Sequence, residues 1–249
     1  MRNIWTIARR EYNHFFASPI AYVVAFAILL IVGAIFALVI LDASQSAFGG
    51  FGAPPAPDMR AVAWWFNFMI ILSAPALTMR LISEEHRMGT VELLLTAPVR
   101  DWELVIGKWL GGFLFMLTII AVTIIYPLIL NGLEKPGIDQ GQMMSAYLGL
   151  ILLSAALLGL GVGISSLFNN QIAAFFATLA VFIFLTWIVS FLSQISPGGK
   201  DVFAYLSMNT HFDSLNSGAI NLSDLVYFLS LTVLGLFTGA VAVEFRRWN

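Results

Sequence analysis

The sequence predicts an all-α polytopic membrane protein with six transmembrane helices, on two observations. Of the 249 residues, 59% are hydrophobic and only 10% are charged, whereas soluble domains are roughly half apolar and about a quarter charged. The apolar residues also form unbroken blocks of about 20 residues, the length a helix needs to cross a bilayer. Lipid cannot satisfy free backbone groups, so helices are expected, and the short alternating segments of a β-barrel are missing. The six blocks are residues 20–41, 62–82, 110–130, 147–168, 172–195 and 225–244 of a single transmembrane domain.

The distribution of Lys and Arg predicts that both termini are cytoplasmic, because basic residues collect in cytoplasmic loops. With that orientation, the residues inside are Arg2, Arg9, Arg10, Arg80, Arg87, Arg100, Lys108, Arg246 and Arg247. Those outside are Arg60, Lys135 and Lys200. The net charge of −2 gives no support for nucleic-acid binding.

Residues 1–18 predict an amphipathic helix ahead of the first span. At 100° per residue, Trp5, Tyr12 and Phe15 lie on a face opposite Arg9 and Arg10. An aromatic face opposite a basic one is typical of a helix lying on the inner leaflet. The alternative is an ordinary cytoplasmic extension of the first span.

Residues 83–108 are the longest and most polar cytoplasmic stretch, and they show internal order. Ser83 is suited to cap a short helix, Gly89 permits a sharp turn and Pro98 ends the next helical turn. Asp101 is placed to cap the helix that leads into the third span.

The remaining spans carry packing signals. Pro75 predicts a kink in the second span, and only three residues separate the fourth and fifth spans. Small residues recur at intervals of four, which lets helix backbones approach closely; they are Ala155, Gly159 and Gly163 in the fourth span and Gly235 and Gly239 in the sixth. Residues 196–223 predict an outer loop with short helices, in which Asn221 and Asp224 cap the sixth span.

The residue types present in the spans and loops argue against an intramembrane enzyme or a self-powered transporter. The span interiors hold no ionisable group, which intramembrane catalysis or proton coupling needs. There is no cysteine, and the three histidines are far apart. His211 and Asp213 form only a weak candidate pair for a metal, so no metal site is predicted. Without a GxxxxGK[ST] loop the chain has no such nucleotide site of its own, and its energy must come from a separate subunit docked on residues 83–108.

The segment TMRLISEEHRMGTVELLLTAPVRDWELVIGKWLGG resembles the stretch between the second and third spans of ABC-2 type transporter permeases, with most similarity to the gliding-motility-type bacterial branch. FFASPIAYVV and THFDSLNSGAINLSDLVYFLSL add to the resemblance. It implies a bacterial cytoplasmic membrane location, a partner ABC ATPase that holds ATP and Mg, and a second permease copy or related membrane subunit. It also allows an exported, membrane-anchored accessory subunit, and implies no cofactor in this chain.

By the same resemblance, a coupling helix seated in the ATPase would include Glu84, Glu85, Arg87, Gly89, Thr90, Glu92, Leu93 and Leu94. The interfacial helix would carry Trp5, Arg9, Arg10 and Glu11, the last three touching the ATPase. His86 departs from the family, where Lys or Arg is commoner. The expected function is export coupled to ATP hydrolysis by the partner. The alternative is an ATP-powered assembly or force-transmitting complex that moves no solute.

Overall fold

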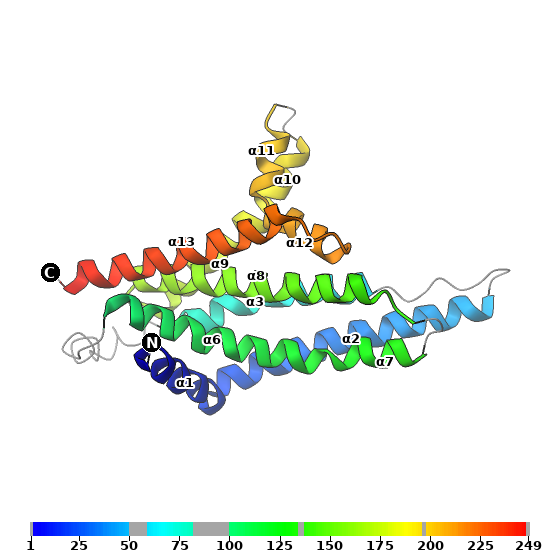
Figure 1. The fold of residues 1–249 in the computed structure, drawn as a ribbon, viewed down its shortest axis with the longest axis horizontal. Helices are drawn as coiled ribbons and strands as arrows, with labels where there is room; N and C mark the ends of the chain where they lie inside the picture. The colour runs from blue at the N-terminus through cyan, green and yellow to red at the C-terminus, as the bar shows by residue number, and fades with distance from the viewer. Residues whose placement is uncertain (1, 50–58, 82–99, 134–136, 196–197, 248–249) are drawn as a thin grey trace.

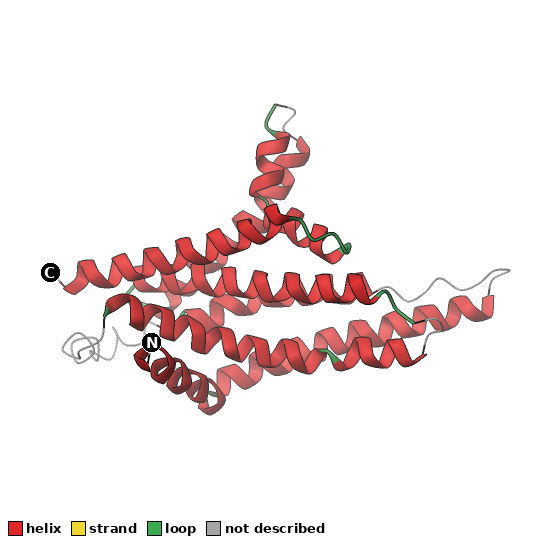
Figure 2. Cartoon of the chain, in the orientation of Figure 1, coloured by secondary structure: helices red, strands yellow, loops and turns green. Residues whose placement is uncertain are grey.

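A computed structural model describes residues 2–49, 59–81, 100–133, 137–195 and 198–247, and those residues form helices joined by short connections (Figures 1 and 2). Six of the helical stretches are long and apolar enough to cross a membrane, as predicted. In chain order the helices are α1 (Arg2–Ala17), α2 (Pro19–Gly49), α3 (Met59–Thr78), α6 (Asp101–Thr123), α7 (Ile125–Leu133), α8 (Gln140–Leu167), α9 (Gln171–Ile183), η1 (Phe184–Ile188), α10 (Val189–Ile195), α11 (Lys200–Leu206), α12 (Met208–Asn216) and α13 (Leu222–Arg247).

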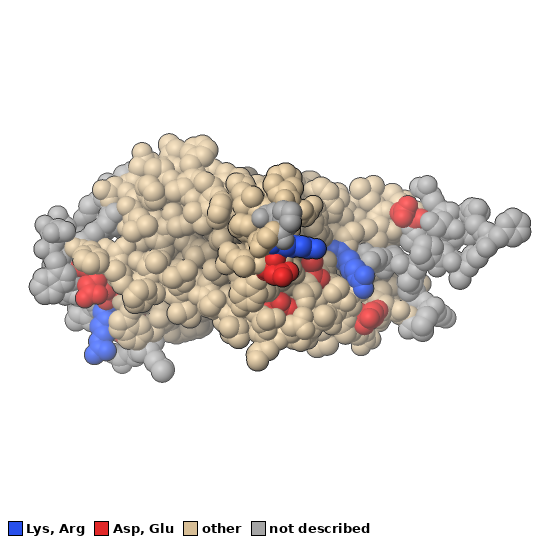
Figure 3. Space-filling model, turned by 90° about the horizontal axis from the view of Figure 1, so that it is seen from above, with Lys and Arg blue, Asp and Glu red and all other residues tan. Residues whose placement is uncertain are grey.

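The bundle is built around α8, which lies between α13 on one side and α3 and α6 on the other (Figure 1). Its apolar window is 78% buried, whereas that of α2 is only 22% buried. The fourth span is therefore the core of the molecule, and the first span lies at its edge. The face seen in Figure 3 has charged side chains at its left end and again from its middle to the right, with an uncharged belt between them. Such a belt fits a lipid-exposed surface.

Glycines let α8 and α13 pack in direct backbone contact. A β-carbon added to Gly235 would overlap the backbone of Gly159, and one added to Gly163 would overlap Gly235. A β-carbon added to Gly239 would lie 3.4 Å from the Cα of Gly163. These four glycines thus lie at one seam, where close approach replaces the hydrophobic effect as the source of stability.

The fifth span is interrupted by a turn of π-helix, η1 (Phe184–Ile188). Beyond it, α10 and α11 form a hairpin that projects sideways from the bundle (Figure 1). Asn209 Nδ2 donates to the Thr186 carbonyl at 3.2 Å, and the Ser190 and Ser207 hydroxyls lie 2.5 Å apart. The first contact joins α12 to η1, and the second joins α10 to the N-cap residue of α12.

One predicted cap is wrong. Arg100, not Asp101, is the N-cap of α6, because Arg100 is extended with a ψ of 144° while Asp101 already lies in the first turn. The carboxylate of Glu103 accepts from the Arg100 backbone N–H at 3.2 Å. Pro75 lies inside α3, where the helix continues to Thr78, so the kink stays a prediction.

Candidate coupling site

The first helix packs tightly against the start of the third span. A β-carbon added to Gly107 would lie 2.8 Å from Cβ of Ile7, and one added to Gly111 would lie 3.0 Å from the Ala8 carbonyl oxygen. Two glycines four residues apart therefore form a flat surface on α6 that receives α1. Ala8 is fully buried there.

A buried ion pair crosses this contact. Lys108 Nζ lies 3.0 Å from Glu11 Oε1, and the two side chains are only 3% and 11% exposed. Removing one partner of a buried ion pair is strongly destabilising. The pair therefore fixes the register of α1 on α6.

The amino-terminal end of α1 is tied to the first turn of α6. Asn3 Nδ2 donates to Glu103 Oε2 at 3.3 Å, and the same carboxylate oxygen receives the Arg100 backbone N–H. Arg100 and Glu103 follow directly after residues 82–99 in the chain.

The carboxy-terminal end of α1 meets the chain directly before residues 82–99. Arg80 Nη1 donates to the Ser18 hydroxyl at 3.0 Å. A β-carbon on Gly112 would lie 3.7 Å from both Leu81 and Phe15, so these two side chains converge on the same turn of α6. One helix thus contacts both ends of the segment between the second and third spans, and it can transmit a displacement of that segment to α3 and α6 together.

The four residues assigned to the interfacial helix have different surroundings. Trp5 is 58% exposed, and Arg9 and Arg10 are also exposed. Glu11 is buried against Lys108, so this carboxylate is not available at the surface. The predicted coupling residues, from Glu84 to Leu94, lie outside the described residues.

Sequence reasoning missed Lys108, Gly107 and Gly111. A signal was present: GKWLGG places two glycines four residues apart around a lysine at the start of a span. On α1, Ala8, Glu11 and Phe15 share one stripe at intervals of three and four residues, and Glu11 is the acidic residue in it.

A second polar cluster lies where α11 and α12 meet the start of α13. His211 Nδ1 lies 2.7 Å from Asp224 Oδ1, and His211 Nε2 lies 2.8 Å from the Tyr205 carbonyl oxygen. The imidazole stacks on Tyr227 with ring centroids 4.0 Å apart. The partner of His211 is therefore Asp224 rather than Asp213, and the described residues contain no group of three or more His, Cys, Asp or Glu that could hold a metal.

Hydroxyl groups within the spans mostly bond to backbone carbonyls or to each other. The Tyr147 hydroxyl donates to the Thr123 carbonyl at 2.9 Å, and Tyr12 and Thr118 pair at 3.1 Å. These are structural helix-to-helix bonds. The described residues thus form a bundle with six candidate membrane spans, in which α1 contacts both sides of one connecting segment.

Comparison with known proteins agrees with a membrane protein of several spans. The family model for "ABC-2 family transporter protein" matches residues 5–246, so the chain belongs to that family. It is therefore a multi-pass membrane protein of permease type. It is 28% identical over 159 residues to a probable ABC transporter permease protein, NosY, of Stutzerimonas stutzeri, an alignment covering 64% of this chain and 56% of that protein.

A second relative is a probable multidrug ABC transporter permease, YbhR, of Escherichia coli strain K12. The identity is 25% over 141 residues, which is 57% of this chain and 35% of YbhR. The chain thus spans between about a third and just over half the length of these curated relatives.

Proposed function

We propose that this chain is the transmembrane permease subunit of an ATP-driven ABC-2 exporter, in which a separate ATPase subunit supplies the energy. The observation that carries the proposal is the attachment of α1 to both ends of residues 82–99, through Asn3 and Glu103 at one end and Ser18 and Arg80 at the other. That arrangement suits a segment that receives movement from a docked motor.

In this proposal residues 83–108 seat in the ATPase, with Glu84, Glu85, Arg87, Gly89, Thr90, Glu92, Leu93 and Leu94 in the contact. The exposed Arg9 and Arg10 of α1 add a second contact. Closure of two ATPases moves the docked segment, and the Glu11–Lys108 pair makes α1 follow α6.

The proposed setting is the bacterial cytoplasmic membrane, with both termini in the cytoplasm. Lys and Arg counts favour that orientation. The proposed assembly contains two permease chains, identical or related, and two ATPase subunits. Similarity of residues 78–112 to the gliding-motility-type branch supports placing the chain there, together with an exported, membrane-anchored accessory subunit.

The experiment is copurification of the tagged chain with its ATPase from membranes. Deleting residues 84–96 should abolish recovery of the ATPase, and Gly89→Pro should leave the complex assembled but with ATPase activity no longer responsive to the permease. Glu84→Ala and Glu85→Ala should act in the same direction. Full recovery of the ATPase with the deletion variant would show that docking lies elsewhere.

The gliding-type similarity also favours a second candidate, a membrane subunit of an assembly or force-transmitting complex that moves no solute. The two functions differ in what a cell lacking the chain accumulates. A compound retained inside that cell and released by the restored wild-type chain supports export. A defect in motility or surface assembly with no retained compound supports force transmission.

A further inference from the structure

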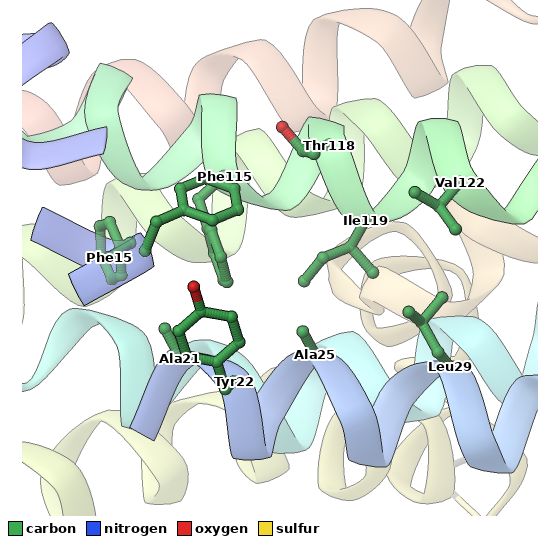
Figure 4. Close-up of a pocket in the computed structure, with 10 residues that line it drawn as sticks. Phe15, Ala21, Tyr22, Ala25, Leu29, Phe115, Thr118, Ile119 and Val122 are labelled. Carbon is green, nitrogen blue, oxygen red and sulfur yellow. The ribbon is translucent and has the colours of Figure 1, made fainter. Parts of the chain in front are cut away.

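An apolar groove lies between α1, α2 and α6, where the first span separates from the third (Figure 4). Its volume is about 160 Å³. Phe15 and Phe16 of α1, Ala21 to Leu29 of α2, and Phe115 to Val122 of α6 supply the lining. The groove lies in the half of the α2 span that begins next to α1.

Aromatic contacts close the two ends of the groove. At one end Phe15 stacks on Phe115 with ring centroids 5.1 Å apart. Beyond the other end the Tyr126 hydroxyl donates to the Leu29 carbonyl at 3.3 Å, and its ring stacks on Phe36 at 4.9 Å. The third span therefore contacts α1 at one end of the groove and the first span beyond the other end.

The groove is open along its side to whatever surrounds the protein. Tyr22, Val122 and Phe16 line it, yet they are 58%, 52% and 39% exposed. In a membrane the surrounding medium at this position is lipid, because α2 is apolar from Pro19 almost to Asp42.

The chemistry of the lining selects an apolar occupant. The only side-chain hydroxyls among the lining residues are those of Tyr22 and Thr118. Thr118 already bonds to the Leu114 carbonyl at 2.9 Å and to Tyr12 at 3.1 Å. Water in such a groove would lack the two to four polar partners that a bound water needs.

A positive charge stands at the end next to α1. Arg80 is held there by its bond to the Ser18 hydroxyl, and Ser18 lies between the lining residues Phe16 and Ala21. Guanidinium groups match phosphate oxygens in geometry and charge. An apolar channel with a cation at one end complements an acyl chain attached to a phosphate.

We propose that this groove binds one acyl chain of an anionic phospholipid, with the phosphate beside Arg80. A helix of a second copy is about 10 Å across and too wide for a groove of about 160 Å³, which holds a segment of one acyl chain. A bound lipid would fill the wedge between the loosely packed α2 and the rest of the bundle, so the lipid composition would influence how α2 moves. The proposal does not depend on the docking of an ATPase.

The natural absence of cysteine makes the test direct, since each introduced cysteine is the only one. Val122→Cys, at the rim of the groove, carries a bimane fluorophore. Ile124→Cys is the matched control, because it is exposed, close in depth and, as the αR cap residue that ends α6, about 200° around the axis of that helix. Both labelled proteins are placed in phosphatidylcholine vesicles that contain phosphatidylglycerol or phosphatidylcholine with brominated chains, which quench the fluorophore on contact.

The expected result is half-maximal quenching at Val122→Cys at a several-fold lower fraction of brominated phosphatidylglycerol than at Ile124→Cys. The preference over brominated phosphatidylcholine should disappear in the Arg80→Gln background. Equal quenching at the two positions, or by the two lipids, would overturn the proposal. Protection of Val122→Cys from both lipids would overturn it too, because a protein side chain would then fill the groove.

A second measurement does not rely on the label. Ala25→Trp places an indole in the groove, while Ala34→Trp places one on the opposite, exposed face of α2. Native mass spectrometry of the folded proteins should show an anionic phospholipid retained by the wild type and Ala34→Trp and lost from Ala25→Trp. Retention by all three would overturn the proposal.

Discussion

The Glu11–Lys108 ion pair is distinguished by how deeply both side chains are buried. The carboxylate and the ammonium lie 3.0 Å apart and are 11% and 3% exposed. Burial removes the hydration of both charges, and their attraction offsets that cost only while both are present. The pair therefore fixes the register of α1 on α6. Its contribution is tested by removing one of the two partners.

Glu11→Gln should lower the free energy of unfolding by about 3–5 kcal/mol, because it removes the carboxylate that lies 3.0 Å from the buried Lys108 ammonium. The double variant Glu11→Met with Lys108→Met should recover most of that loss. Thermal unfolding in detergent micelles measures both. The control is Glu244→Gln, an exposed carboxylate on α13 whose neutralisation should change little. An equal loss in the single and double variants would show that packing, not charge, holds α1.

At the scale of elements, the seam between α8 and α13 is set by glycine. The backbones at Gly159 and Gly235 are so close that no β-carbon fits between them. The α8 core is therefore rigid on this side, whereas α2 lies at the edge of the bundle and packs mainly against α3.

Gly235→Ala should destabilise the bundle by about 1–3 kcal/mol or more, since overpacking forces the two helices apart. Gly132→Ala is the matched control, because a β-carbon at Gly132 meets nothing within 4 Å. There the higher helix propensity of alanine should leave stability unchanged or raise it slightly. Melting temperatures that fall equally in both variants would contradict the assigned contact.

The attachment of α12 to α13 rests on His211 and Asp224. Both ring nitrogens of His211 lie within hydrogen-bond distance of oxygen atoms, those of the Asp224 carboxylate and the Tyr205 carbonyl. A hydrogen bond to a carboxylate contributes about 1.5–3 kcal/mol.

Asp224→Ala should therefore loosen the outer helices and raise the rate at which protease cuts between residues 195 and 222, by about tenfold or more if the opening equilibrium follows those magnitudes. Asp213→Ala removes an exposed carboxylate from the same helix as His211 and is the control. Unchanged cleavage in Asp224→Ala would show that the histidine pair does not hold α12.

How far the sequence determines the fold differs between these elements. The number of spans follows from the lengths of the apolar blocks alone, because a helix needs about 20 apolar residues to cross the hydrocarbon core of a bilayer. The pairing of Glu11 with Lys108 could not be predicted that way: a helical wheel shows only α1 itself, and the partner lies 97 residues on. His211 lies two residues from Asp213 in sequence, but the chain reversal between α12 and α13 brings Asp224 to it instead.

At the scale of the whole molecule, the proposed function depends on which side of the membrane each end of the bundle faces. The basic residues favour a cytoplasmic position for α1 and the carboxy terminus of α13, and an outer position for α11 and α12. The chain has no cysteine, so single-cysteine variants report one position each. Asn13 on α1 and Ser217 after α12 are both exposed, and they lie on opposite sides in this orientation.

Ser217→Cys should react with a membrane-impermeant maleimide in intact cells, while Asn13→Cys should react only after the membrane is opened. The reason is that Asn13 precedes all six spans, whereas Ser217 follows five of them. An odd number of crossings places the two residues on opposite sides of the membrane. The labelled fraction is read by gel shift, with full labelling of both variants in permeabilised cells as the control. Labelling of Asn13→Cys in intact cells would place α1 outside, and a docking segment on that side could not meet a cytoplasmic ATPase.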